Sequence, residues 1–160
     1  MIISTFNVRG ICGRVKKNKI SDLGRQNNLD FLALQETKLM EVSPSLCYSI
    51  WGNEDCDWVF RASEGSSGGI LSIWRKSSAN FVASFDGEGY VGVILEWGVE
   101  KTRCVVINVY SKCDLPAKRR LWENLIGERH TREGGVWCVL RDFNVVRKRD
   151  ERRGGGGGGV

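Results

Sequence analysis

The apolar run Val136–Leu140 most constrains this chain, because it is long enough for one buried strand and ends abruptly. Arg141 and Asp142 follow it, Phe143 is apolar again, and Asn144 is polar. A carboxylate and a carboxamide just past a buried strand are poor core residues, but they suit a sheet rim that orients water and phosphate oxygens. The alternative is an ordinary turn, which Asp and Asn favour by themselves. The rest of the chain decides between these interpretations.

Length and composition exclude several classes of protein. The 160 residues predict one domain that is large enough to bury a core, and the formal net charge of +5 is compatible with a polyanionic partner. The N-terminus lacks the features of a signal peptide, and no window is apolar enough to span a membrane. The six cysteines include no C-x-x-C pair, and the single histidine cannot complete a usual zinc set. We therefore expect an intracellular monomer, nuclear or cytoplasmic, with free thiols, no disulfide-linked partner and no membrane contact.

The apolar pattern predicts a strand, a helix and a second strand, followed by a series of short strands. The first three elements span Ile2–Val8, Lys16–Asn28 and Asp30–Gln35. The last of these is apolar on both faces, so we expect it to be covered on both sides. Five further runs with short breaks are typical of an antiparallel meander: Trp58–Arg61, Gly69–Arg75, Phe81–Phe85, Tyr90–Trp97 and Thr102–Tyr110.

A second helix is predicted after Asp114, which is a suitable N-cap. Its apolar face would use Leu121, Trp122 and Leu125, and Gly127 or the Gly134–Gly135 pair would end it. The six tryptophans fall mostly in strands or on helix faces, so we assign them to the core. The order of elements predicts a mixed α/β layered sandwich.

Polar residues end four of the predicted strands. Asn7, Glu36 and the Asp142/Asn144 pair each lie at a carboxyl end, and Asn108 with Tyr110 ends another strand. Such ends converge on one rim in layered α/β folds. Carboxylates beside amides form an oxygen donor set that suits Mg²⁺, which would neutralise a phosphodiester. Asp142 is then placed to hold the attacking water, and Asn144 and Asn7 to donate hydrogen bonds.

Five short motifs occur in a fixed order: N-V-R-G at 7–10, L-Q-E-T-K at 34–38, S-G-G-I at 67–70, N-V-Y at 108–110 and R-D-F-N at 141–144. Together they resemble the endonuclease/exonuclease/phosphatase superfamily, which has the DNase I-like fold. Within it, the chain resembles the apurinic-endonuclease-like domain of plant LINE-type (non-LTR) retrotransposons, and E-R-R-G at 151–154 fits that subgroup. The similarity covers roughly Met1 to Gly154.

The resemblance implies α/β (α+β) architecture: a partial four-layer αββα sandwich of two mixed, mostly antiparallel sheets, over residues 1–153. Residues 154–160 would be a disordered, glycine-rich tail. It further implies a nuclease that depends on Mg²⁺ (or Mn²⁺) and acts on DNA. Glu36 would be the metal ligand and Asn7 its neighbour, and Tyr110 would contact the phosphate. Asp142 and Asn144 would position the water and bind the phosphate.

Two departures from the family pattern concern the second half of the site. Arg141 replaces the glycine of G-D-F-N, and an arginine at that position could displace Asp142. The S-D-H motif that supplies the family's histidine and its partner aspartate is absent, and His130 lies at the wrong point in the order, so we expect a surface position for it. We therefore expect a C-terminally truncated domain that is inactive or crippled. The alternatives are a non-catalytic retroelement remnant with weak nucleic-acid binding, and a same-fold inositol-phosphate or lipid phosphoesterase.

Overall fold

The computed structural model describes residues 1–65, 67–110, 114–132 and 134–141. Eight strands and three α-helices make up this part of the chain, together with one short 3₁₀ helix. In order they are β1 (Ile3–Asn7), α1 (Arg14–Gln26), β2 (Phe31–Gln35), α2 (Pro44–Trp51), β3 (Cys56–Glu64), β4 (Ser67–Arg75), η1 (Lys76–Ser78), β5 (Ala79–Gly87), β6 (Tyr90–Trp97), β7 (Thr102–Val109), α3 (Leu115–Thr131) and β8 (Val136–Arg141).

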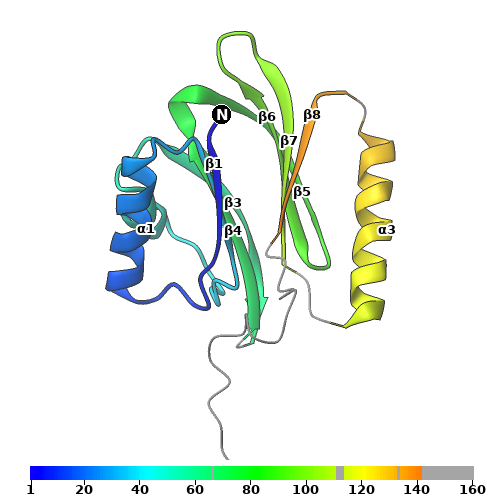
Figure 1. Cartoon of the computed structure of the whole chain (residues 1–160), viewed down its shortest axis with the longest axis horizontal. Coiled ribbons are helices and arrows are strands. Elements are labelled where there is room, and N and C mark those ends of the chain that lie inside the picture. Colours follow the sequence, from blue (N-terminus) through cyan, green and yellow to red (C-terminus); the bar gives the residue numbers. More distant parts are fainter. Residues whose placement is uncertain (66, 111–113, 133, 142–160) are drawn as a thin grey trace, which may run out of the picture.

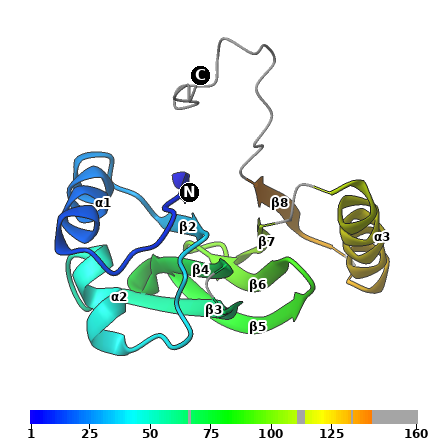
Figure 2. The ribbon, with the colours of Figure 1, turned by 90° about the horizontal axis from the view of Figure 1, so that it is seen from below.

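The strands form two four-stranded sheets that stack face to face. Their orders are β1-β2-β4-β3 and β5-β6-β7-β8. Each sheet is mixed: β1 runs parallel to β2 and β7 parallel to β8, whereas the other pairs are antiparallel. Helices α1 and α2 cover one outer face and α3 covers the other (Figures 1 and 2). The sequence-based prediction of a four-layer sandwich with two mostly antiparallel sheets is therefore confirmed.

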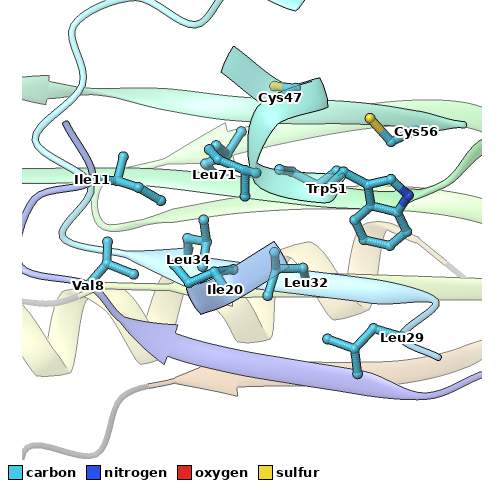
Figure 3. Packing of buried hydrophobic residues seen from close by; sticks show 12 residues of the cluster. Val8, Ile11, Ile20, Leu29, Leu32, Leu34, Cys47, Trp51, Cys56 and Leu71 are labelled. Carbon is cyan, nitrogen blue, oxygen red and sulfur yellow. The ribbon is translucent and has the colours of Figure 1, made fainter. Parts of the chain in front are cut away.

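Three apolar layers hold this stack together. The first lies between the β1-β2-β4-β3 sheet and helices α1 and α2, and it contains Leu32, Ile50 and Trp51 (Figure 3). The second lies between the two sheets and is built around Phe31, Trp74 and similar residues, with the Phe31 and Trp74 rings stacked at 6.3 Å. The third joins the second sheet to α3 through Leu121, Leu125 and the residues that they cover.

Strand β2 shows why its sequence has apolar residues at every position but the last. Leu32 and Leu34 point into the layer under the helices, whereas Phe31 and Ala33 point into the layer between the sheets. All five residues of β2 are buried. The prediction that this strand is covered on both faces is confirmed, because alternate side chains of a strand enter opposite faces.

The predicted five-strand meander is wrong in one respect. Strands β3 and β4 pair with each other in the first sheet, and β5, β6 and β7 pair in the second. The chain changes sheets at η1, between β4 and β5. Hairpins and sheet changes both use short polar connections, so the spacing of the strands does not distinguish them.

Helix α3 differs from its prediction at one residue, Trp122. Of its two predicted ends the structure agrees with the second, since the helix continues through Gly127 and ends at Thr131, before the Gly134–Gly135 pair. Trp122 is 44% exposed, so its assignment to the core is wrong. Leu121 and Leu125 fill the buried stripe of the helix, and Trp122 is rotated about 100° from Leu121, out of that stripe.

The predicted chemistry of the cysteines agrees with the structure where it describes them. Cys12, Cys47, Cys56, Cys104 and Cys138 are free thiols. No helix in the described ranges is both long enough and apolar enough to cross a membrane. The E-R-R-G motif at 151–154 and the predicted glycine-rich tail at 154–160 concern residues outside the described ranges.

Candidate active site

The carboxyl ends of the parallel strands meet at one edge of the stacked sheets. In the first sheet, Asn7 at the end of β1 lies opposite Gln35 at the end of β2. In the second sheet, Val109 of β7 lies opposite Arg141 of β8. Figure 1 shows β1, β7 and β8 all running toward the lower edge of the molecule. We call this edge the rim; it carries Asn7, Glu36 and Tyr110, three of the sequence-predicted site residues.

A buried amide pair fixes the two sheets relative to each other at the rim. Gln35 Nε2 donates to Asn108 Oδ1 at 2.5 Å and to Thr5 Oγ1 at 2.8 Å. Asn108 Nδ2 lies 3.1–3.3 Å from three acceptors of the first sheet, namely Leu34 O, Leu71 O and Ser72 Oγ. Gln35 and Asn108 are both 0% exposed, so their role is structural, and they set how the strand ends face each other.

Glu36 follows β2 in a conformation that L-residues rarely adopt. Its φ is +55°, and its carbonyl accepts a hydrogen bond from Gly10 N at 2.7 Å. The next residue, Thr37, donates its N–H to Gly69 O at 3.0 Å. Backbone contacts from the loop after β1 and from the start of β4 therefore hold this turn, and the Glu36 side chain is left half-buried.

Asn7 stands beside that turn. Its Oδ1 accepts a hydrogen bond from Arg9 N at 3.2 Å, and Val8 N donates to Gln35 O at 3.0 Å. The β1 and β2 ends thus enter the rim side by side, each followed by a loop that contacts the other. Asn7, the last residue of β1, and Glu36, the first residue after β2, are the two predicted site residues that the structure brings to adjoining strand ends.

Tyr110 reaches the rim from the second sheet. Its N–H donates to Gly89 O at 2.8 Å, and a Cβ at Gly68 would lie 3.8 Å from its ring. Lys38 N donates to Gly68 O at 3.0 Å, so one short glycine segment connects the Glu36 loop with the tyrosine. A pocket of about 220 Å³ opens here, lined by Tyr110, three glycines and flanking charged residues such as Glu64 and Glu88.

The remaining predictions divide into two groups. Asp142 and Asn144 lie outside the described residues. Arg141, which replaces the family glycine, is the last residue of β8 and continues its ladder opposite Val109. His130 is exposed in the last turn of α3, so the prediction of a surface position is confirmed.

Sequence reasoning placed Asn108 at the end of a site strand, but it did not identify its structural role or its partner Gln35. A signal for both was present. Gln35 ends a run of four apolar residues, and Asn108 interrupts a run of valines and isoleucine. An amide in an otherwise apolar strand must find partners inside the fold, and the other buried amide is the natural one.

The side-chain oxygens at the rim can be compared with the ligands that Mg²⁺ requires. No three His, Cys, Asp or Glu side chains gather into a metal cluster among the residues that the structure describes. Mg²⁺ does not require such a cluster, because it keeps several waters and needs only one or two carboxylates plus phosphate oxygens. The Glu36 carboxylate, with the Asn7 amide oxygen at the end of the adjoining strand, fits that minimal set.

Comparisons with known proteins bear on the fold. No protein-family profile matches the chain, and no curated protein matches it. Among solved structures it is similar to the AP endonuclease LMAP of Leishmania major, with 18% identity and a TM-score of 0.61 over 96% of this chain and 58% of that one. It is also similar to the catalytic domain of Xenopus laevis APE2, with 19% identity and a TM-score of 0.59 over 92% of this chain and 60% of the other.

A third similar structure is an endonuclease/exonuclease/phosphatase family protein of Bacteroides thetaiotaomicron, with 10% identity and a TM-score of 0.68 over 89% of this chain and 61% of that one. The chain therefore spans about three-fifths of the length of the structures that it matches. At these identities the likeness concerns the backbone. The chain has the α+β sandwich fold of the endonuclease/exonuclease/phosphatase (DNase I-like) proteins.

Proposed function

We propose that this chain is a DNA endonuclease-type phosphodiesterase domain of LINE-type retrotransposon origin, with a Mg²⁺ site at the rim and strongly reduced cleavage. The proposal is carried by one observation: a half-buried carboxylate, Glu36, is held in a strained turn by backbone contacts from the loop after β1 and from the start of β4. Strained, over-determined turns are concentrated at functional sites. The resemblance of the sequence motifs supports the proposed origin, and solved structures described as AP endonucleases share the fold.

In this proposal Glu36 holds the ion, and Asn7 and Tyr110 contact the phosphate. The ion, when bound, would neutralise charge on the phosphate and on the leaving oxygen. Asp142 and Asn144 are proposed to position the attacking water.

Reduced cleavage follows from the position of the histidine. The sequence has one histidine, His130, and it is exposed in the last turn of α3. Helix α3 begins beside the rim and runs away from it (Figure 1), and His130 lies in its last turn. A missing general acid or base typically costs about 10²–10⁴-fold in rate. We expect cleavage below that of an enzyme with a histidine in its site by at least this factor.

Exposed cations near the rim favour DNA as the partner even if cleavage is absent. Arg9, Arg14 and Lys38 are exposed, and none of them forms an ion pair within the described ranges. Gly10 and Lys38 are in contact range across the two loops, since a Cβ at Gly10 would lie 3.5 Å from Lys38 Cδ. Such cations neutralise phosphates and make binding dependent on salt. A non-catalytic, DNA-binding remnant is therefore the second candidate.

The test is relaxation of supercoiled plasmid with Mg²⁺ or Mn²⁺, followed over hours at high protein concentration. Slow nicking that EDTA and Glu36→Ala abolish supports the endonuclease. Glu41→Ala is the matched control, because Glu41 is exposed in the segment that follows the rim loop. Nicking that survives Glu36→Ala would refute the assignment. Salt-sensitive DNA binding without nicking would support the second candidate in its place.

A further inference from the structure

Lys16, the third residue of α1, directs its ammonium group into the loop that follows β1. Its Nζ donates to three successive carbonyl oxygens: Val8 O at 2.7 Å, Arg9 O at 3.3 Å and Gly10 O at 2.9 Å. The carbonyls converge because Arg9 and Gly10 both have positive φ, +46° and +91°. An ammonium carries three N–H donors and no acceptor, so its capacity matches the three carbonyls.

The position of Lys16 is unfavourable for the helix itself. The first turn of a helix carries a partial positive charge that disfavours lysine, and the first turn of α1 contains no acidic residue. The contact with the three carbonyls offsets that repulsion. Lys16 and Lys19 are both exposed residues of this helix, but they differ in their contacts. Lys16 binds the loop after β1, whereas the Lys19 side chain forms no hydrogen bond or ion pair among the described residues.

The other side of the same loop supports the turn that carries Glu36. Gly10 N donates to Glu36 O at 2.7 Å, and Ile11 N donates to Thr37 O at 3.2 Å. The carbonyls of this loop thus bind Lys16, and its amides bind the Glu36 turn. If the Lys16 contact were lost, the 8–11 loop alone would carry the resulting displacement to the Glu36 turn.

We propose that Lys16 is a positioning residue for the Glu36 site: its ammonium fixes the 8–10 loop, and the loop fixes the carboxylate that binds the divalent cation. This inference rests on the proposed function. It also implies that Lys16 does not contact the nucleic acid, because its three N–H donors are already bound to carbonyl oxygens of the protein.

The test compares Lys16→Met, Lys16→Arg and the control Lys19→Met in the full chain. The first measurement is amide hydrogen exchange at Gly10 and Ile11, whose N–H groups bond to the Glu36 turn. We expect both Lys16 variants to exchange at least about tenfold faster there, with unchanged exchange in β6. Lys16→Arg should fail to rescue, since a planar guanidinium cannot direct three donors at carbonyls that surround one point.

The second measurement is the affinity for Mn²⁺ alone, followed by water proton relaxation. By Coulomb's law, removing a cation should strengthen the binding of another cation. Positioning predicts the opposite sign: Lys16→Met should weaken Mn²⁺ binding by about 10-fold or more, as the loss of an outer-shell partner does. Lys19→Met should not weaken it, and Glu36→Gln should abolish it.

The two measurements separate the possible failures. Unchanged exchange at Gly10 and Ile11 in Lys16→Met would overturn the clamp itself. Faster exchange with equal or tighter Mn²⁺ binding would overturn the positioning role. If the unsubstituted chain binds no Mn²⁺, the proposed metal site fails and the positioning role with it, whereas the exchange data still report whether Lys16 holds the loop.

Discussion

Replacing Asn108 by alanine should be among the most damaging single changes to this fold. The side chain is 0% exposed; its oxygen accepts one hydrogen bond from Gln35, and its two N–H donors are shared among three acceptors of the first sheet. A neutral side-chain hydrogen bond contributes about 1 kcal/mol net, so the loss of three predicts about 3 kcal/mol. Gln35 keeps its bond to Thr5, so the amide that remains is not left without a partner. This is a large share of the about 5–15 kcal/mol that stabilises a typical domain.

The assay is equilibrium unfolding in guanidinium chloride, followed by the fluorescence of the tryptophans. Asn80→Ala is the matched control, because Asn80 is exposed in β5 and should change the free energy of unfolding by less than about 0.5 kcal/mol. Asn108→Asp should be worse than Asn108→Ala, since its oxygens would face the carbonyls of Leu34 and Leu71. A loss below about 1 kcal/mol in Asn108→Ala would refute the view that this amide joins the sheets.

Two further predictions follow. Gly69→Ala should destabilise the fold by about 2 kcal/mol or more, because Gly69 has a φ of +86° and a Cβ there would lie 2.5 Å from the hydroxyl oxygen of Thr37. Gly24→Ala in α1 should instead stabilise the fold by up to about 1 kcal/mol. Urea unfolding tests both variants, and a neutral Gly69→Ala would contradict the close packing of Gly69 against Thr37. Burial raises the pKa of Cys47 to about 12 and that of Cys56 to about 11, whereas the thiols of the unfolded chain ionise near pH 9.0. The contribution of these two thiols to stability is therefore complete below pH 9 and is lost as the pH rises toward 11–12. In the folded chain, iodoacetamide at pH 8 should label the exposed Cys12 well before Cys47 or Cys56, and mass spectrometry would show this order.

The layered fold could be predicted from the sequence because apolar and polar residues alternate along most of its strands, and because the buried strand β2 is apolar on both faces. Helix α2 was missed: Pro44–Trp51 is only eight residues long and rich in serine and aromatic residues, which have modest helix propensity. Its end signals were nevertheless present, since Ser43 caps it by accepting from Leu46 N and Gly52 ends it in the left-handed conformation. Short helices are held by tertiary packing, here through Cys47, Ile50 and Trp51, and periodicity alone cannot reveal that.

The rim illustrates the same limit. Asn7 and Glu36 could be singled out because each follows an apolar strand, and parallel pairing of β1 with β2 then places them together. The bond between Gln35 and Asn108 joins residues 73 positions apart, and it depends on how the two sheets stack. The contact of Lys16 with three carbonyls depends on two positive φ values in a loop, which no local pattern encoded.

The left-handed backbone at Glu36 means that the residue best for stability, glycine, is not the residue that supplies a carboxylate. For an ordinary residue this conformation costs about 1–2 kcal/mol, and glycine would relieve it entirely. A chain optimised only for persistence would therefore be expected to drift toward glycine at position 36, and it would lose the carboxylate by doing so. Under the proposed function, related sequences that keep an acid at this position would keep the metal-binding carboxylate, and those with glycine there would have exchanged it for a more stable turn.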